Sequence, residues 1–176
     1  MKMIKNILVI ALLLVAGLHT NAQEQEISNL KKNELKVDVA FILGATIKVE
    51  YEHLLNDWSS LGAMTAYNFS EDNFSDMRFQ MLGFYRLYFG KNPVTGFFLE
   101  GNMGITSVDD YQYIYPSYDA RKTTNTAFGV GIAIGWKWHI AQSNIVLDIF
   151  GGAGRLFTEN SDRAYPRMGI CVGKRF

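Results

Sequence analysis

The sequence has little cysteine, little proline and no excess of charge of either sign. Its single cysteine, Cys171, excludes an internal disulfide framework and a metal site built from several cysteines. The 17 Lys and Arg residues are matched by 17 Asp and Glu residues, so nucleic acid is not expected as a partner. Only three prolines, 16 glycines and 14% aromatic residues exclude a collagen-like chain and favour many β-strands with tight bends.

Long hydrophobic runs are also missing, apart from one near the start of the chain. Residues 7–18 form an apolar run that follows Lys2 and Lys5 and precedes a set of small residues. A helix of these twelve residues rises about 18 Å, well short of the roughly 30 Å core of a bilayer, which excludes a membrane anchor. We therefore expect residues 1–22 to be a secretory signal peptide that is removed from the mature protein.

From residue 35 onward, hydrophobic residues alternate with small or charged ones. Residues 23–34 are charged and polar, which predicts a periplasmic lead-in to one barrel domain over residues 35–176. No later run of 18 apolar residues and no stripe at helical spacing occurs, which excludes a membrane helix and a helical bundle. The alternation predicts strands at residues 35–43, 45–54, 60–68, 77–89, 97–106, 126–138, 145–156 and 167–176. The predicted fold is all-β, an eight-stranded antiparallel up-and-down transmembrane β-barrel.

The connections between the predicted strands differ in length on the two sides of the barrel. Those on the side of the chain ends are short, at residues 55–59, 90–96 and 139–144. Those on the opposite side are longer, at residues 69–76, 107–125 and 157–166. Short periplasmic turns and longer external loops are typical of outer-membrane barrels.

The small and charged faces of the strands are predicted to point into the barrel. The interior of an eight-stranded barrel is only just wide enough to be filled by side chains, so no open pore is expected. Buried charges must be paired, and both signs are present on the predicted inner faces. We therefore expect a structural charge network of Lys48, Glu50, Glu52, Arg78, Arg86, Glu100, Lys137, Asp148 and Arg167.

Aromatic residues gather near both ends of the predicted strands, as they do at the two interfaces of a membrane. Trp58, Trp136 and Trp138 lie on the side of the chain ends, and Tyr67 and Phe157 lie on the opposite side. The alternative is a soluble periplasmic barrel of the lipocalin kind, because an apolar interior and a polar exterior give the same alternation. Such a barrel would carry a lipid inside.

The last strand carries a family resemblance. Residues 167–176 end in Phe176 and have apolar residues at alternate positions, Met168, Ile170 and Val172. This segment resembles the final strand of an outer-membrane β-barrel, which implies that Phe176 belongs to the signal read by the barrel-assembly machinery. With the predicted signal peptide and eight strands, the chain resembles the small outer-membrane barrels of the OmpA transmembrane-domain and OmpX kind, and uncharacterised barrel families of Bacteroidota. We expect a protein of the bacterial outer membrane, in contact with lipid and lipopolysaccharide and a monomer by default.

The predicted connection 107–125 is the best candidate for molecular recognition. Its mixture of tyrosines and charged residues is similar to the composition of binding loops. The candidate residues are Tyr111, Tyr113, Tyr115, Tyr118, Arg121 and Lys122. The alternative is a solvated loop, or one that only contacts lipopolysaccharide. We expect a structural or adhesive role for the outer loops, with a protein of the cell envelope as a candidate partner.

Residues suited to catalysis are few. His53 and His139 fall near the periplasmic side in different strands, and neither belongs to the His, Ser and Glu grouping of a deacylase. Cys171 faces inward in the last predicted strand and is interpreted as a small filler. No motif for phosphate or metal binding occurs, so we expect no enzyme activity, no cofactor and no metal. A barrel enzyme that modifies lipid A is the second alternative.

Overall fold

The computed structural model describes residues 31–42, 45–69, 77–114, 119–157 and 163–176. The predicted signal peptide, residues 1–22, lies outside the described residues, as does most of the predicted lead-in. Residues 32–176 form one compact unit, which holds every element below. None of the described helices is long and apolar enough to cross a membrane.

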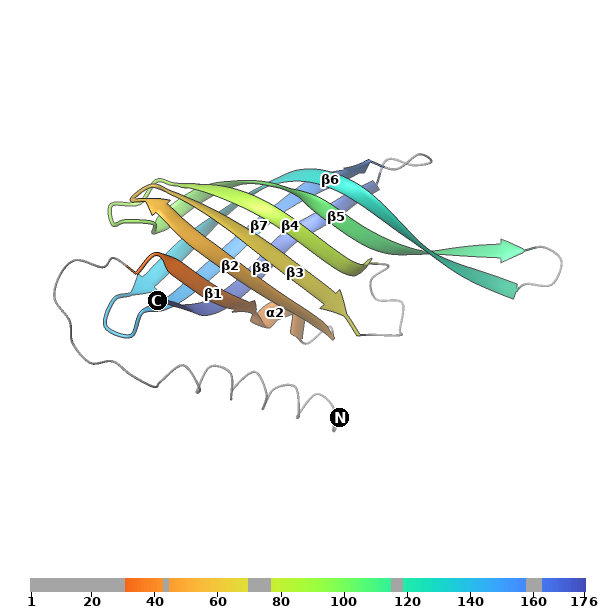
Figure 1. Ribbon diagram of the computed structural model, residues 1–176, viewed down its shortest axis with the longest axis horizontal. Coiled ribbons are helices and arrows are strands. Elements are labelled where there is room, and N and C mark those ends of the chain that lie inside the picture. Colours follow the sequence, from red (N-terminus) through yellow and green to blue (C-terminus); the bar gives the residue numbers. More distant parts are fainter. Residues whose placement is uncertain (1–30, 43–44, 70–76, 115–118, 158–162) are drawn as a thin grey trace, which may run out of the picture. The chain divides into compact units, whose positions relative to one another are not determined.

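Eight strands and one short helix make up this unit (Figure 1). They are β1 (Asn33–Asp38), α2 (Val39–Ile42), β2 (Thr46–Asn56), β3 (Ser59–Asn68), β4 (Met77–Tyr88), β5 (Gly96–Ile114), β6 (Asp119–Ile140), β7 (Ile145–Phe157) and β8 (Arg163–Arg175). Each strand pairs antiparallel with the next along the chain, and β1 also pairs with β8, which closes the sheet. The predicted all-β, eight-stranded antiparallel barrel is confirmed.

The barrel has two ends, which we name the terminal end and the hairpin end. At the terminal end, Asn33 N donates a hydrogen bond to Phe176 O at 3.0 Å, and Phe176 N donates to Asn33 O at 2.8 Å. The connections β2–β3, β4–β5 and β6–β7 lie at this end. The hairpin end holds the connection between β5 and β6, the two longest described strands, at 19 and 22 residues.

The long connection predicted at residues 107–125 is for the most part a β-hairpin. β5 runs on to Ile114, which pairs with Asp119 of β6, so that only residues 115–118 separate the two strands. Similarly, β8 begins at Arg163, inside the connection predicted at residues 157–166. The difference arises because alternation of apolar and polar residues is required only where one face of a strand is buried.

β1 is shorter than the strand predicted at residues 35–43, because the chain turns into α2 after Asp38. Oδ1 of Asp38 accepts a hydrogen bond from Ala40 N at 3.0 Å, which is the contact made by a helix N-cap. The four residues Val39–Ile42 then form α2. An apolar run this short is compatible with a strand or with a helical turn, so periodicity does not separate the two.

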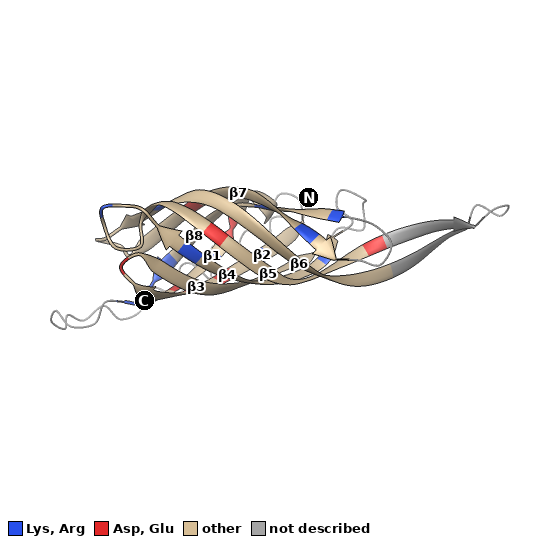
Figure 2. Ribbon diagram, turned by 90° about the horizontal axis from the view of Figure 1, so that it is seen from above, with Lys and Arg blue, Asp and Glu red and all other residues tan. Residues whose placement is uncertain are grey.

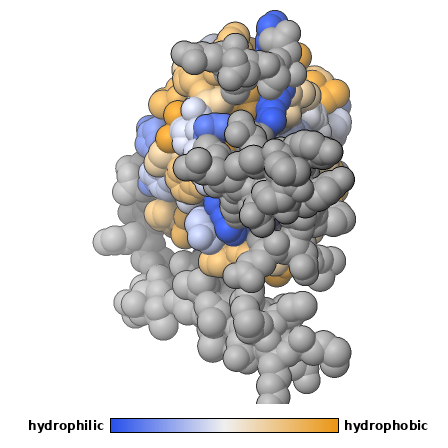
Figure 3. All heavy atoms as spheres, turned by 90° about the vertical axis from the view of Figure 1, so that its right-hand side faces the viewer, coloured by the Kyte–Doolittle hydropathy of each residue, from blue (hydrophilic) through white to orange (hydrophobic). Residues whose placement is uncertain are grey.

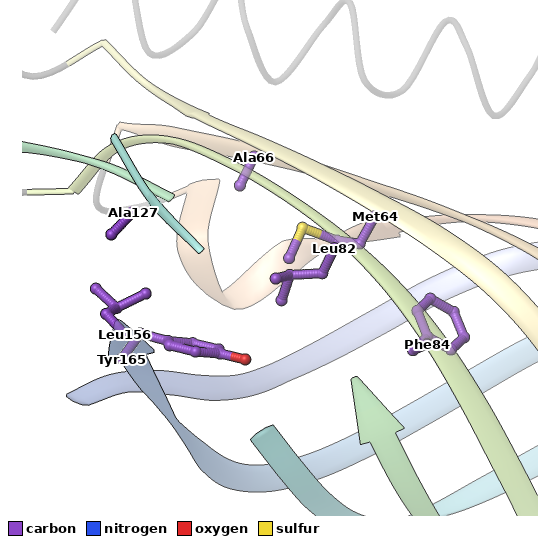
Figure 4. Packing of buried hydrophobic residues seen from close by; sticks show 7 residues of the cluster. All are labelled: Met64, Ala66, Leu82, Phe84, Ala127, Leu156 and Tyr165. Carbon is purple, nitrogen blue, oxygen red and sulfur yellow. The ribbon is translucent and has the colours of Figure 1, made fainter. Parts of the chain in front are cut away.

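Side chains alternate between the inside and the outside of the barrel along the strands. On β6, Ile132 is 68% exposed and the adjacent Ala133 is 2% exposed. Acidic and basic residues are distributed along the barrel strands (Figure 2), and most of those on the inner faces are buried. Toward the hairpin end the interior contains an apolar cluster (Figure 4), which consists of Met64, Ala66, Leu82, Phe84, Ala127, Leu156 and Tyr165.

Tyr165 fits inside the barrel because glycine lies opposite its ring. A Cβ atom at Gly154 would overlap the Tyr165 ring, whose hydroxyl donates to Oδ1 of Asn102 at 2.6 Å. We expect Gly154→Ala to lower the free energy of unfolding by about 1–3 kcal/mol, the usual cost of overpacking a core. Urea unfolding of the purified protein measures this loss.

Gly151→Ala is the matched control on the same strand. Gly151 is exposed on the outer face, and a Cβ atom there would meet nothing within 4 Å. Its free energy of unfolding is expected to stay within about 0.5 kcal/mol of the wild type. Equal losses in the two variants would contradict the tight fit of Tyr165.

Candidate functional site

The barrel interior is filled by charged side chains of both signs, which we call the interior network. Its acidic members are Glu34, Asp38, Glu50, Glu52, Glu100 and Asp148, and its basic members are Lys36, Lys48, Arg86, Lys137, Arg167 and Arg175. None of the twelve is more than 7% exposed. Six carboxylates and six cations leave the network with no net formal charge. This balance matters because charges removed from water are tolerated only when they are compensated.

Arg86 lies at the centre of the interior network. Its guanidinium donates to Glu100 Oε2 at 2.8 Å, to Asp148 Oδ2 at 2.9 Å and to Glu52 Oε2 at 3.0 Å. The same group lies over the rings of Phe84 and Phe98, with 4.4 and 4.6 Å from Cζ to the ring centroids. Arg86 therefore connects β4 with β2, β5 and β7 through charge, and packs against aromatic faces in the remaining directions.

The other cations extend the interior network to the remaining strands. Lys137 Nζ on β6 donates to Glu34 Oε2 at 2.8 Å and to Glu52 Oε1 at 2.7 Å. Arg167 on β8 donates to Glu100 Oε1 at 2.8 Å, and Ser60 on β3 donates to Glu52. Each of the eight strands thus contributes at least one hydrogen-bonding side chain. Such a connected set of contacts fixes the strand register and fills the interior.

Eight of the nine predicted network residues lie in the interior network: Lys48, Glu50, Glu52, Arg86, Glu100, Lys137, Asp148 and Arg167. Arg78 is the exception, because its side chain is 31% exposed at the hairpin end, with Nε 3.5 Å from Oδ2 of Asp109. Arg78 is the second residue of β4, where the barrel interior meets solvent. We therefore correct its assignment from the interior to the rim.

Four members of the interior network were not among the predicted residues: Glu34, Lys36, Asp38 and Arg175. Glu34 had been assigned to the lead-in, and Arg175 stands next to the last residue of the chain. For Lys36 and Asp38 a signal was present, because they alternate with Leu35 and Val37 at the period of two that identified the other inner faces.

The terminal end of the barrel is filled by side chains. Val94, in the β4–β5 connection, is 1% exposed and belongs to a buried cluster with Leu54, Tyr88, Phe98, Phe150 and Cys171. Its N–H donates to Asp57 O at 2.8 Å, and its carbonyl accepts a hydrogen bond from Arg175 at 3.3 Å. The connection is therefore held across the interior at this end, which opposes an open pore.

The outer surface of the barrel is hydrophobic, and aromatic residues lie near both of its ends. Exposed aromatic residues at the terminal end include Trp58, Phe89, Phe97, Trp136, Trp138 and Phe176, and those at the hairpin end include Tyr67, Phe69, Phe128 and Phe157; Tyr51 and Tyr85 are exposed as well. Seen from the hairpin end, hydrophobic residues form much of the outline that grey atoms leave visible (Figure 3). The distribution of charge is thus the inverse of that in a water-soluble protein, which keeps its apolar residues inside.

The predicted recognition residues fall on the β5–β6 hairpin. Tyr111 pairs with Lys122, Tyr113 with Ala120, and Arg121 with Gln112, whereas Tyr115 and Tyr118 lie outside the described residues. β4 pairs with β5 no further than Val108, and β7 pairs with β6 no further than Phe128. Beyond these points the hairpin continues without neighbouring strands in the described part of the chain, as Figure 1 shows. We call this part the projecting hairpin.

The three residues considered for catalysis, His53, His139 and Cys171, lie at separate positions in the barrel. Nδ1 of His53 is 2.8 Å from Oδ1 of Asn33, which also accepts a hydrogen bond from the Tyr51 hydroxyl at 2.7 Å. His139 lies on β6, near the terminal end, opposite Val146 of β7. Cys171 is fully buried in the cluster that closes the terminal end.

Comparisons with known proteins give one family and two similar structures. The family described as "Protein of unknown function (DUF3575)" matches residues 8–174. The N-terminal β-barrel domain of Pseudomonas aeruginosa OprF is 13% identical with a TM-score of 0.45, over 82% of this chain and 96% of that one. The outer membrane protein Ail of Yersinia pestis, in a phospholipid bilayer nanodisc, is 10% identical with a TM-score of 0.46, over 84% of this chain and 100% of that one. No curated protein matches. The predicted link to Bacteroidota families stays a prediction.

Proposed function

We propose that this chain, which belongs to the family described as protein of unknown function DUF3575, is an integral outer-membrane β-barrel without an open pore. Its role is structural or adhesive, and the projecting hairpin on the outer side of the membrane carries that role. No catalytic step is part of the proposal.

The observation that carries the proposal is the inverted distribution of side chains. Arg86 and Glu100 inside the barrel are fully buried, whereas Ile132 outside is 68% exposed. Exposed apolar surface costs roughly 25 cal/mol per Å² in water, and this cost disappears in hydrocarbon. The soluble alternative requires an apolar interior that accommodates a lipid, and a charged interior contradicts it. The alternative of an enzyme acting on lipid A gains no support from His53, whose imidazole contacts an asparagine.

The height of the apolar surface is consistent with a bilayer. On β6 the outward residues from Phe128 to Ile140 are all hydrophobic and exposed. Twelve residue steps span about 40 Å along a strand, and about 30 Å along the axis of a barrel whose strands are tilted by about 40°. Outer-membrane barrels have an apolar band of about 25 Å between two aromatic girdles. The two groups of exposed aromatic residues suit those girdles.

The projecting hairpin supports an interaction role. A two-stranded ribbon is at best marginally stable alone in water, so its unpaired edges are suited to contact with another molecule. Tyrosines beside charged residues suit recognition. The chain termini belong on the periplasmic side, where outer-membrane barrels have their short turns, which directs the hairpin outward.

Membrane fractionation followed by gel electrophoresis tests the proposal. We expect the protein in the outer-membrane fraction, with a compact band that shifts on boiling. Trypsin added to whole cells is expected to cut at Arg121 and Lys122 and to leave the barrel intact. Two assays report on the adhesive role, cell aggregation and chemical cross-linking to other envelope proteins. The cut should abolish both. A double variant, Arg121→Gln with Lys122→Gln, is the control that should resist this cut. Recovery in the soluble periplasm, or cleavage only after the outer membrane is opened, would contradict the proposal.

A further inference from the structure

The barrel wall has a gap toward the hairpin end, between β8 and β2. β1 pairs with β8 only as far as Asp38 and with β2 only as far as Val37. Beyond these pairs β8 continues for eight residues, to Arg163, and β2 for three, to Thr46. In the described ranges no strand fills the space between them, and α2 contacts both instead. We call this region the wall gap.

Two polar backbone groups of β8 along the wall gap form hydrogen bonds with side chains. Lys48 Nζ donates to Met168 O at 2.6 Å, and Ile170 N donates to Oδ1 of Asp38 at 3.3 Å. Because every second residue of a strand directs its backbone groups to the same side, Pro166 also faces the gap, and proline has no N–H to satisfy. The same Lys48 lies 3.8 Å from the ring centroid of Phe41 on α2. Side chains and Pro166 therefore protect part of the β8 edge along the wall gap.

A cavity of about 240 Å³ lies at the wall gap. Ala66 lines it from inside the barrel, where it is buried, and Met168 lines it from the outer face, where it is 46% exposed. Residues that face the interior and a residue of the outer face thus both line the cavity. A second cavity of about 280 Å³ shares Met77 and Pro166 with the first and reaches Tyr165 of the apolar cluster. Each is smaller than the roughly 300–1,000 Å³ of a drug-sized site, and two adjoining small cavities suit a long, thin molecule.

We propose that the wall gap is a lateral entrance through which the alkyl chain of a long-chain fatty acid enters the barrel wall from the membrane. This inference rests on the proposed membrane location, which brings the outer faces of Pro166 and Met168 into contact with hydrocarbon. Phe41, Met77 and Met168 supply the apolar lining for the chain. A phospholipid, which has two chains, is a poorer occupant, because the opening leads into one narrow space.

Arg78 is the residue that receives the carboxylate. It lines the same cavity, with Nε 3.5 Å from Oδ2 of Asp109 and Nη1 donating to Asn68 O at 3.5 Å. Its side chain is still 31% exposed, so a ligand carboxylate would share the guanidinium with Asp109. A guanidinium binds a carboxylate through two parallel hydrogen bonds. Lys48 also lines the cavity, but its ammonium group holds the gap together through Met168 O and lies 2.8 Å from Oδ2 of Asp38. The two cations thus have different tasks, ligand recognition for Arg78 and support of the gap for Lys48.

Photo-cross-linking tests the entrance. The full chain, in phospholipid nanodiscs, is exposed to a long-chain fatty acid with a diazirine in its chain, and the labelled residues are identified by mass spectrometry. We expect labels at Phe41, Met77 and Met168. Ala66→Phe, which fills the cavity from inside, should abolish them, whereas Ala63→Phe, which adds the same bulk on the exposed face of β3, should not. Arg78→Gln should bind the fatty acid about tenfold more weakly, because a charge-assisted contact is lost, and bind the matching fatty alcohol unchanged.

Three outcomes would overturn the entrance. These are equal labelling of wild type and Ala66→Phe, labels spread evenly around the outer surface, and equal labelling by a phospholipid that carries the same chain. If Ala66→Phe fails to assemble, the fatty acid and alcohol titrations of Arg78→Gln decide. The heat-shifted band of the wild type tests the membrane barrel separately from the lateral entrance. An assembled barrel without labels contradicts the entrance alone, whereas a soluble wild type contradicts the membrane location as well.

Discussion

Arg86→Met is expected to lower the free energy of unfolding by about 3–5 kcal/mol, the cost of removing one partner from a buried charge pair. The substitution leaves the carboxylates of Glu52, Glu100 and Asp148 short of one cation in a region that is fully buried. Methionine keeps the unbranched apolar stem of arginine without the guanidinium, so the loss reports mainly on charge. Urea unfolding of the chain refolded into phospholipid vesicles, followed by the heat-shifted band, is the measurement.

Arg78→Met is the matched control, on the same strand. Arg78 is 31% exposed and pairs with Asp109 at the rim, so its loss is expected to cost only about 0–1 kcal/mol. In the Arg86→Met background, Glu100→Gln should recover part of the lost stability, because it restores equal numbers of acidic and basic groups in the interior network. Equal effects of the two arginine substitutions would contradict the central position of Arg86.

Ile132→Arg is expected to cost about 2–4 kcal/mol of folding free energy in a bilayer, the range for arginine facing lipid at the midplane of a β-barrel. Ile132 is 68% exposed and lies within the hydrophobic outer stretch of β6. In the bilayer its replacement brings a cation into hydrocarbon. Unfolding equilibria of wild type and variant in vesicles of the same lipid give the difference directly.

Ile140→Arg on the same strand calibrates this effect for depth. Ile140 is 55% exposed at the terminal end of β6, where an arginine can reach the polar interface, so the expected cost is only about 0–1 kcal/mol. Ile132→Arg should therefore lower the free energy of unfolding in lipid more than Ile140→Arg does. Equal stabilities of the wild type and Ile132→Arg in lipid would contradict the assigned outer face.

The barrel itself was predictable because its sequence alternates wherever a strand has one face inside and one outside. On β2, Lys48, Glu50 and Glu52 alternate with Ile47, Val49 and Tyr51, and the structure places these two sets on opposite faces. Strand number, antiparallel order and eight members of the interior network follow from the same period of two. These features can be predicted strand by strand, because the alternation lies within the sequence of each strand.

Features that depend on distant contacts were not predictable. The end of β1 depends on Asp38, whose side chain caps α2 and also accepts a hydrogen bond from Ile170, 132 residues away. The projecting hairpin lies beyond the last pairs of β5 with β4 and of β6 with β7, so the alternation that marks a strand with one face in the barrel interior does not extend to it. The wall gap likewise follows from the different lengths of β1, β2 and β8, which no single segment of sequence reveals.

The position of the two arginines of β8 has a consequence for the order of assembly. Of the interior network, the first seven strands bring all six carboxylates but only four cations, and β8 adds Arg167 and Arg175 with no acid. A nascent seven-stranded sheet therefore carries an anionic concave face, which must stay hydrated. β8 neutralises the interior when it pairs with β1 and closes the sheet. Pairing of β8 with β1 thus both closes the sheet and balances the charge of the interior network.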